Sequence, residues 1–150
     1  MHGNLNLAVK MVFVLICVVF VSVPVVLSNN NEVSINITAI MASHETDSID
    51  SDLMPIADEF KTLFSYSSYK KIKKYTVVLK ENQSDRIVLP QEQDLVVDYK
   101  GLDEKDNIAI HVSMGGVLNT DFTLIDGGHI LIGGPEYEDG VLVLLFEAKF

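Results

Sequence analysis

GGPEYEDGVLVLLFEA, residues 133–148, is the stretch that decides the fold of this chain. Residues 133–140 supply the glycines and polar side chains that a reversing chain needs, and they join the apolar run 129–132 to a second run, 141–148. This arrangement predicts a β-hairpin. Because the second run alternates too little for an edge strand, we place it inside a sheet that is covered on both faces.

Short strand-like runs, separated by turn residues, fill the chain before this hairpin. They span residues 74–80, 86–89, 95–99, 107–113 and 121–125. A further run at residues 33–42 alternates between apolar and polar side chains, which is typical of a half-buried strand. Its apolar side consists of Val33, Ile35, Ile37, Ala39 and Met41, and its polar side of Ser34, Asn36 and Thr38.

A single amphipathic helix is predicted between the first run and the others. Residues 43–51 (SHETDSIDS) form a polar loop that leads into it. Asp52 is the expected N-cap, and Pro55 is tolerated because first-turn amides lack helical partners. The apolar residues then follow helical spacing, at Leu53, Ile56, Ala57, Phe60, Leu63 and Phe64. We expect this helix to cover one face of the sheet that holds residues 141–148.

The order of these elements predicts an α+β fold. Its sheet is mainly antiparallel, with six to eight short strands and one helix. A β-sandwich carrying one helix is the alternative. Residues 33–150 are enough for one domain with its own core. The only cysteine, Cys17, precedes this domain, so the domain has no disulfide and no thiolate metal site.

The N-terminus carries an export signal in this interpretation. Residues 11–27 are apolar apart from Ser22 and Pro24, with Lys10 before them and a polar linker, residues 29–32, after them. Residues 1–28 fit a cleaved signal peptide, and they are also near the minimum length of a membrane anchor. In both cases Lys10 stays on the cytoplasmic side, so we expect the domain to be periplasmic, secreted or anchored outside.

The net charge of −10 comes from 21 acidic and 11 basic residues, and the first acidic residue is Glu32. A domain this negative repels phosphate backbones, so nucleic acid is not an expected partner.

Four landmarks give the chain a family resemblance. They are TAIMAS (residues 38–43), FSYSSYK (64–70), IVLP (87–90) and the stretch 133–148 quoted above. Together they resemble a group of small exported bacterial proteins of unassigned function. The resemblance implies export and a single domain, and it transfers no catalytic residue.

Motifs for catalysis are incomplete. The glycine pairs at residues 115–116, 127–128 and 133–134 lack the helix that a phosphate loop requires, so we interpret them as turn glycines. His111 should lie on the outer face of its strand. A hydrolase that uses His111 or His129 with a nearby carboxylate is the enzymatic alternative. No cofactor is expected.

The polar loop is also acidic, and it offers oxygen ligands for calcium at Glu45, Asp47, Asp50 and Asp52, next to His44. It lacks the spacing and the central glycine of a known calcium loop. We expect a solvated loop, with a calcium-stabilised domain as the alternative.

A basic patch follows the helix, which is unusual in so acidic a chain. It contains Tyr66, Tyr69, Lys70, Lys71, Lys73, Lys74 and Tyr75. Its lysines suit the C-terminal end of a helix, and its mixed lysines and tyrosines also suit an anionic glycan or an acidic protein. We therefore predict a non-enzymatic extracytoplasmic module that contacts a protein or an envelope component through this patch or a sheet edge. Its oligomeric state is left open.

Overall fold

The structure is a computed structural model that describes residues 32–150. The predictions for residues 1–28, and for all but the last residue of the linker, lie outside this range. The elements are β1 (Val33–Ser43), β2 (Ser48–Ile49), η1 (Ser51–Ile56), α1 (Ala57–Leu63), β3 (Ser68–Leu79), β4 (Gln83–Leu89), η2 (Pro90–Glu92), β5 (Gln93–Leu102), β6 (Ile108–Met114), β7 (Leu118–Leu124), β8 (His129–Tyr137) and β9 (Gly140–Lys149).

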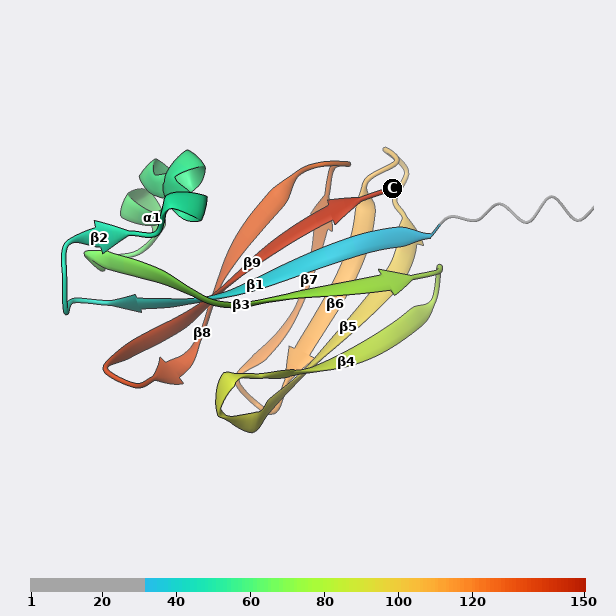
Figure 1. Ribbon diagram of the computed structural model, residues 1–150. Helices are drawn as coiled ribbons and strands as arrows, with labels where there is room; N and C mark the ends of the chain where they lie inside the picture. Colours follow the sequence, from blue (N-terminus) through green and yellow to red (C-terminus); the bar gives the residue numbers. More distant parts are fainter. Residues whose placement is uncertain (1–31) are drawn as a thin grey trace, which may run out of the picture.

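The strands form two sheets that pack face to face, with η1 and α1 at one end (Figure 1). Sheet A has the order β2-β3-β1-β9-β8, and sheet B has the order β4-β5-β6-β7. Every pairing is antiparallel except the short β2–β3 pair. The predicted α+β class with a largely antiparallel, β-dominant structure is confirmed. The packing of two sheets against each other matches the β-sandwich alternative.

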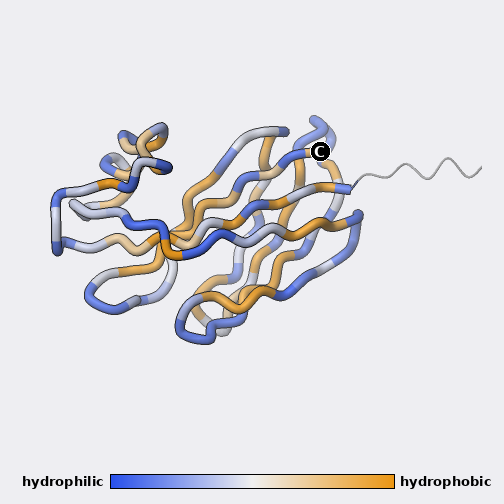
Figure 2. Tube along the Cα trace, in the orientation of Figure 1, coloured by the Kyte–Doolittle hydropathy of each residue, from blue (hydrophilic) through white to orange (hydrophobic). Residues whose placement is uncertain are grey.

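The main core lies between the sheets and follows from the alternation of their strands. Along β6, for example, Ile108, Ile110, Val112 and Met114 are buried, while the residues between them are partly exposed. Figure 2 shows the same alternation of apolar and polar positions along the paired strands, with polar turns between them. The outward position predicted for His111 is therefore confirmed.

A second, small core lies on the other face of sheet A, beneath η1 and α1. It joins Leu53 and Phe60 of the helical segments to buried residues of the sheet, namely Ile40, Ala42, Tyr69, Val143 and Leu145. Since Leu142, Leu144 and Phe146 belong to the main core, β9 is buried on both faces. This confirms its predicted interior position and the helix as its cover.

The helix differs from the prediction in three details. Its first half is a 3-10 segment around Pro55, and the N-cap position is occupied by Asp50, which makes no side-chain cap bond. Asp52 is inside the first turn and pairs with Lys71 instead, so its predicted capping role is wrong. Leu63 is 59% exposed, because the helix ends there and only one of its sides meets the sheet.

The last hairpin also turns later than predicted. Strand β8 continues to Tyr137 and β9 begins at Gly140, so the turn consists of Glu138 and Asp139, with Glu138 in the left-handed region (φ 49°). Gly133 and Gly134 lie within β8 at a bulge, so their interpretation as turn glycines is wrong. A side chain on Gly134 would meet the carbonyl oxygen of Leu142 at 2.9 Å. The other two glycine pairs lie in turns as predicted.

Within residues 32–150, no helix is both long and apolar enough to cross a membrane.

Candidate binding surface along strand β3

Sheet A ends on β3 for most of the length of that strand. Strand β2 pairs only with Ser68 and Tyr69, and β1 occupies the other side of β3 throughout. From Lys70 to Leu79, no other described strand pairs with the outer edge of β3. Figure 1 shows β3 at this margin, with β4 of the other sheet nearby. An unpaired edge exposes main-chain donors and acceptors that another chain can use.

The loop before the helix closes the first part of this edge. The amide of Asp50 donates to the carbonyl oxygen of Tyr69 at 3.0 Å. In return, the amide of Lys71 donates to Asp50 Oδ2 at 2.8 Å. The edge that remains open therefore begins after Lys71.

A β-bulge at Ile72 decides where the lysines point. Lys73 is opposite Ala39 of β1 and Lys71 is opposite Ile40, so Ile72 is the extra residue. Directly opposed residues in a sheet share a face. Lys71 therefore shares the face of Ile40, toward the helix, whereas Lys73 shares the face of Ala39, toward sheet B.

Three residues of the predicted patch are engaged on the helix side. Lys71 pairs with Asp52, and this hydrogen bond and charge hold the pKa of the Asp52 carboxyl below its ordinary value of 3.8. Lys74 Nζ lies 3.7 Å from Glu147 Oε2. Tyr69 is buried in the small core, so it has no surface to offer a partner.

Tyr69 instead holds the helix in place. Its ring stacks on Phe60 with centroids 4.3 Å apart, and its hydroxyl donates to the carbonyl oxygens of Phe60 (3.2 Å) and Phe64 (3.3 Å). Burial raises the pKa of this phenol above its ordinary value of 10.0. Tyr69 is therefore a structural residue.

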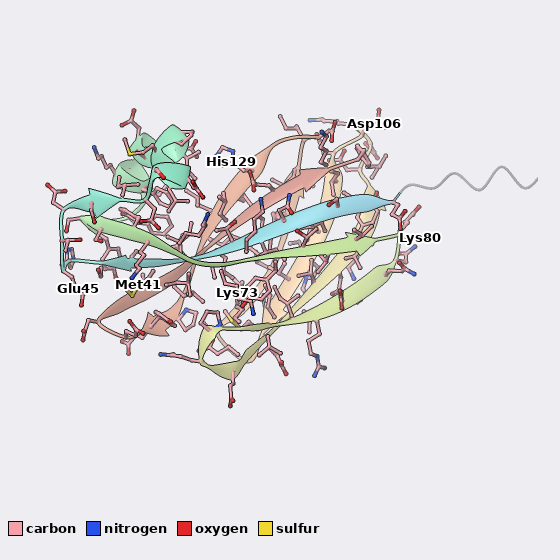
Figure 3. All side chains as sticks on the ribbon, in the orientation of Figure 1. Met41, Glu45, Lys73, Lys80, Asp106 and His129 are labelled. Atoms are coloured by element: carbon pink, nitrogen blue, oxygen red, sulfur yellow. The ribbon has the colours of Figure 1, made fainter. Side chains whose placement is uncertain are left out.

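Three other residues form a row on the face toward sheet B. Lys70 is opposite Met41, Lys73 opposite Ala39 and Tyr75 opposite Ile37, all positions on one side of β1. We call Lys70, Lys73 and Tyr75 the open row. Figure 3 shows Lys73 on the side of β3 away from α1.

The lysines of the open row have no carboxylate within ion-pair distance among residues 32–150. Lys73 Nζ lies 4.9 Å from the centroid of the Tyr75 ring, in cation–π contact. Tyr75 packs partly against the main core, and burial raises the pKa of its phenol above 10.0. The row thus presents two positive charges without a carboxylate partner, and the charge of Lys73 lies beside the Tyr75 ring.

Tyr66 lies apart from the open row, because it precedes β3 and its ring contacts that of His44, with centroids 4.9 Å apart. The seven predicted residues are thus divided between the helix side, the interior and the open row. Sequence reasoning missed the bulge, whose only signal is the apolar Ile72 between two pairs of lysines.

The acidic loop is organised by hydroxyl groups. Thr46 Oγ1 bonds to Ser48 Oγ (2.8 Å) and donates to Ser68 Oγ (3.0 Å), and Ser67 Oγ donates to the carbonyl oxygen of Thr46 (2.7 Å). Asp50 and Asp52 are directed toward Lys71. In the described part of the chain, no three His, Cys, Asp or Glu side chains are grouped closely enough to hold a metal ion.

Each histidine named for the hydrolase has a carboxylate partner. His111 Nδ1 lies 2.9 Å from Asp121 Oδ1, on the outer face of sheet B. His129 Nε2 lies 2.9 Å from Glu59 Oε2, between β8 and α1. His129 also borders a depression of about 350 Å³ whose only side-chain hydroxyl belongs to Thr123. No hydroxyl hydrogen-bonds to either histidine within residues 32–150.

Comparison with protein-family models, curated proteins and solved structures finds no match. The resemblance to small exported bacterial proteins therefore stays a prediction.

Proposed function

We propose that this protein is a non-enzymatic, extracytoplasmic binding module that receives an extended acidic segment of a partner protein along the edge of β3. The observation that carries the proposal is the unpaired edge after Lys71, bordered by the open row. The extracytoplasmic location rests on the sequence of residues 1–28. The module needs no catalytic group to perform this role.

Strand addition supplies affinity through the main chain and specificity through alternate side chains. After the bulge, β3 keeps regular register with β1 from Lys73 to Leu79, so its outer edge can accept a continuous ladder. Val78 is 54% exposed on the helix-side face and offers apolar contact. On the other face the open row provides positive charge.

The charges of the open row favour an acidic partner over a second copy of this chain. Two β3 strands pairing edge to edge would bring lysines close together, and like charges across a strand pair are destabilising. Lysines on an edge strand also protect against such self-association. An acidic strand meets the same lysines as opposite charges.

Peptide titration followed by amide chemical shifts tests this proposal. The probe is a short peptide of alternating glutamate and valine or threonine, and its control carries lysine in place of glutamate. We expect the acidic peptide to shift the amides of residues 73–79 and the basic peptide to leave them unchanged. Equal binding of both peptides, or shifts confined to other strands, would contradict the proposal.

Charge reversal at the open row provides a second test of the proposed binding. Lys70→Glu with Lys73→Glu should weaken binding of the acidic peptide about tenfold, since exposed charge pairs each contribute up to about 1 kcal/mol. Lys105→Glu with Lys149→Glu makes the same change in net charge at exposed positions outside β3, in the β5–β6 turn and at the end of β9, and should alter affinity about twofold or less. If both pairs of substitutions have the same effect, the binding is not local to β3.

A hydrolase centred on His129 is the second candidate, because His129 is hydrogen-bonded to Glu59 beside a depression. Turnover of an ester or peptide probe by the intact domain, lost in His129→Gln, would favour it. The calcium-stabilised domain is checked by the melting midpoint, which should rise with calcium and fall with a chelator if that alternative holds.

A further inference from the structure

A concave surface separate from the open row lies between the helical segments and the start of β3. It has a volume of about 380 Å³ and is bordered by β2, η1, α1 and the loop before β3. Its apolar lining includes Ile49, Met54, Ala57 and Tyr66. We call this surface the helix groove.

The walls of the helix groove are held in place by buried and hydrogen-bonded groups. On one side Tyr69 fixes the end of α1 through its stacking on Phe60 and its two hydrogen bonds. On the other side Thr46 bonds with Ser48 and Ser68 and accepts from Ser67. Binding sites for small molecules are usually preformed in this way.

Two opposite charges border the groove without neutralising each other. Lys61 is in the last turn of α1, and Asp47 precedes β2. Within residues 32–150, neither side chain lies within ion-pair distance of an oppositely charged group. Met54, in the apolar lining of the groove, is 57% exposed. A groove that has an exposed apolar lining and one uncompensated charge of each sign suits a molecule with an apolar body and both a positive and a negative group.

We infer that the helix groove binds a small zwitterionic molecule with an apolar body, of the size of an amino acid or a dipeptide. Its ammonium group pairs with Asp47 and its carboxylate with Lys61. Its apolar part replaces water over Met54 and Tyr66. The volume supports a small ligand, because it lies near the lower end of the range of about 300–1,000 Å³ for ligand pockets.

Amide chemical shifts again provide the test, with leucyl-leucine as the probe. Its N-acetyl form lacks the ammonium group, and its C-terminal amide lacks the carboxylate. We expect leucyl-leucine to shift the amides of Ile49, Met54 and Tyr66, and each blocked form to bind about tenfold more weakly. No shifts with leucyl-leucine or leucine up to their solubility limits, or equal binding of the blocked forms, would overturn the inference.

Two substitutions assign the charges. Lys61→Gln should weaken leucyl-leucine about tenfold while hardly changing the affinity for the C-terminal amide, which has no carboxylate to lose. Asp47→Asn should show the same pattern with the N-acetyl form. Lys105→Gln, in the β5–β6 turn, is the matched control and should change neither affinity. If Lys61→Gln and Lys105→Gln behave alike in spectra of folded protein, the assignment of Lys61 is wrong.

Discussion

The two cores of this protein use opposite faces of the same sheet, and they differ in size and in what surrounds them. The main core holds 19 buried residues drawn from both sheets, whereas the small core holds 7. Stability should therefore come chiefly from the main core. The helix groove borders the small core, and the helix-side part of the predicted patch lies beside it. The main core should therefore maintain the fold, whereas the small core, with fewer buried residues, should open first.

Phe146→Ala should give the largest effect, because it opens a cavity in the main core. Phe146 is fully buried and its ring contacts that of Phe122, with centroids 5.3 Å apart. We expect a loss of about 3–5 kcal/mol in the free energy of unfolding, measured by denaturant titration. A loss near 1 kcal/mol would mean that the main core does not dominate stability.

Phe60→Ala makes the same deletion in the small core and should cost less, about 3 kcal/mol, the lower end of the range for such a truncation, because fewer buried residues surround it. Hydrogen exchange should accelerate in α1 and in the segment 46–50 before it does in sheet B, since weakly held regions open locally. If the amides of sheet B and α1 instead exchange together, the two cores form one cooperative unit and the comparison fails.

Gly140→Ala tests the end of the β1–β9 pair, beside Ala42 of the small core. A side chain at position 140 would collide with the carbonyl oxygen of Ala42, so the strands must separate locally at a cost of about 1–3 kcal/mol. Gly115→Ala is the matched control, because nothing lies within 4 Å of its added Cβ. The thermal unfolding midpoint of Gly140→Ala should be lower than that of Gly115→Ala. Equal midpoints would show that this end of β1 and β9 accommodates a side chain at position 140.

A pair of tyrosines gives the smallest and most specific comparison. Tyr69 and Tyr99 are both buried, but only the hydroxyl of Tyr69 has hydrogen-bond partners among the described residues. Tyr69→Phe should cost about 1 kcal/mol, whereas Tyr99→Phe should be neutral or slightly stabilising. Denaturant midpoints measure both, and a larger loss in Tyr99→Phe would reveal a partner for that hydroxyl.

Much of the fold could be predicted from local patterns in the sequence. Each predicted strand run overlaps an observed strand, although β3 begins at Ser68 and its predicted run at residue 74, and the amphipathic residues 52–64 contain α1. Strand ends were less predictable, since sheet pairing extends a strand beyond its apolar run, as in β8. The predicted capping by Asp52 is wrong because the Asp52 carboxylate forms an ion pair with Lys71, which lies far from it in the sequence.

The candidate site was only partly predictable. Lysines and tyrosines at residues 66–75 indicated a surface, but their spacing could not show that Ile72 is a bulge or that Tyr69 faces the helix. The helix groove gave no signal, because its lining comes from three separate segments. The bulge in β3 and the helix groove both depend on how residues far apart in the chain pair and pack, and local periodicity does not report this pairing.

By itself, the sequence determined the β-rich class, the one helix and the interior position of residues 141–148, because apolar periodicity and run length reflect burial directly. Only the tertiary structure decided that the strands divide into two sheets, that β3 is left at an edge, and which lysines are neutralised. The physical reason is that the burial of each residue is reflected in its own hydrophobicity, whereas edges, bulges and ion pairs depend on which strands pair with each other.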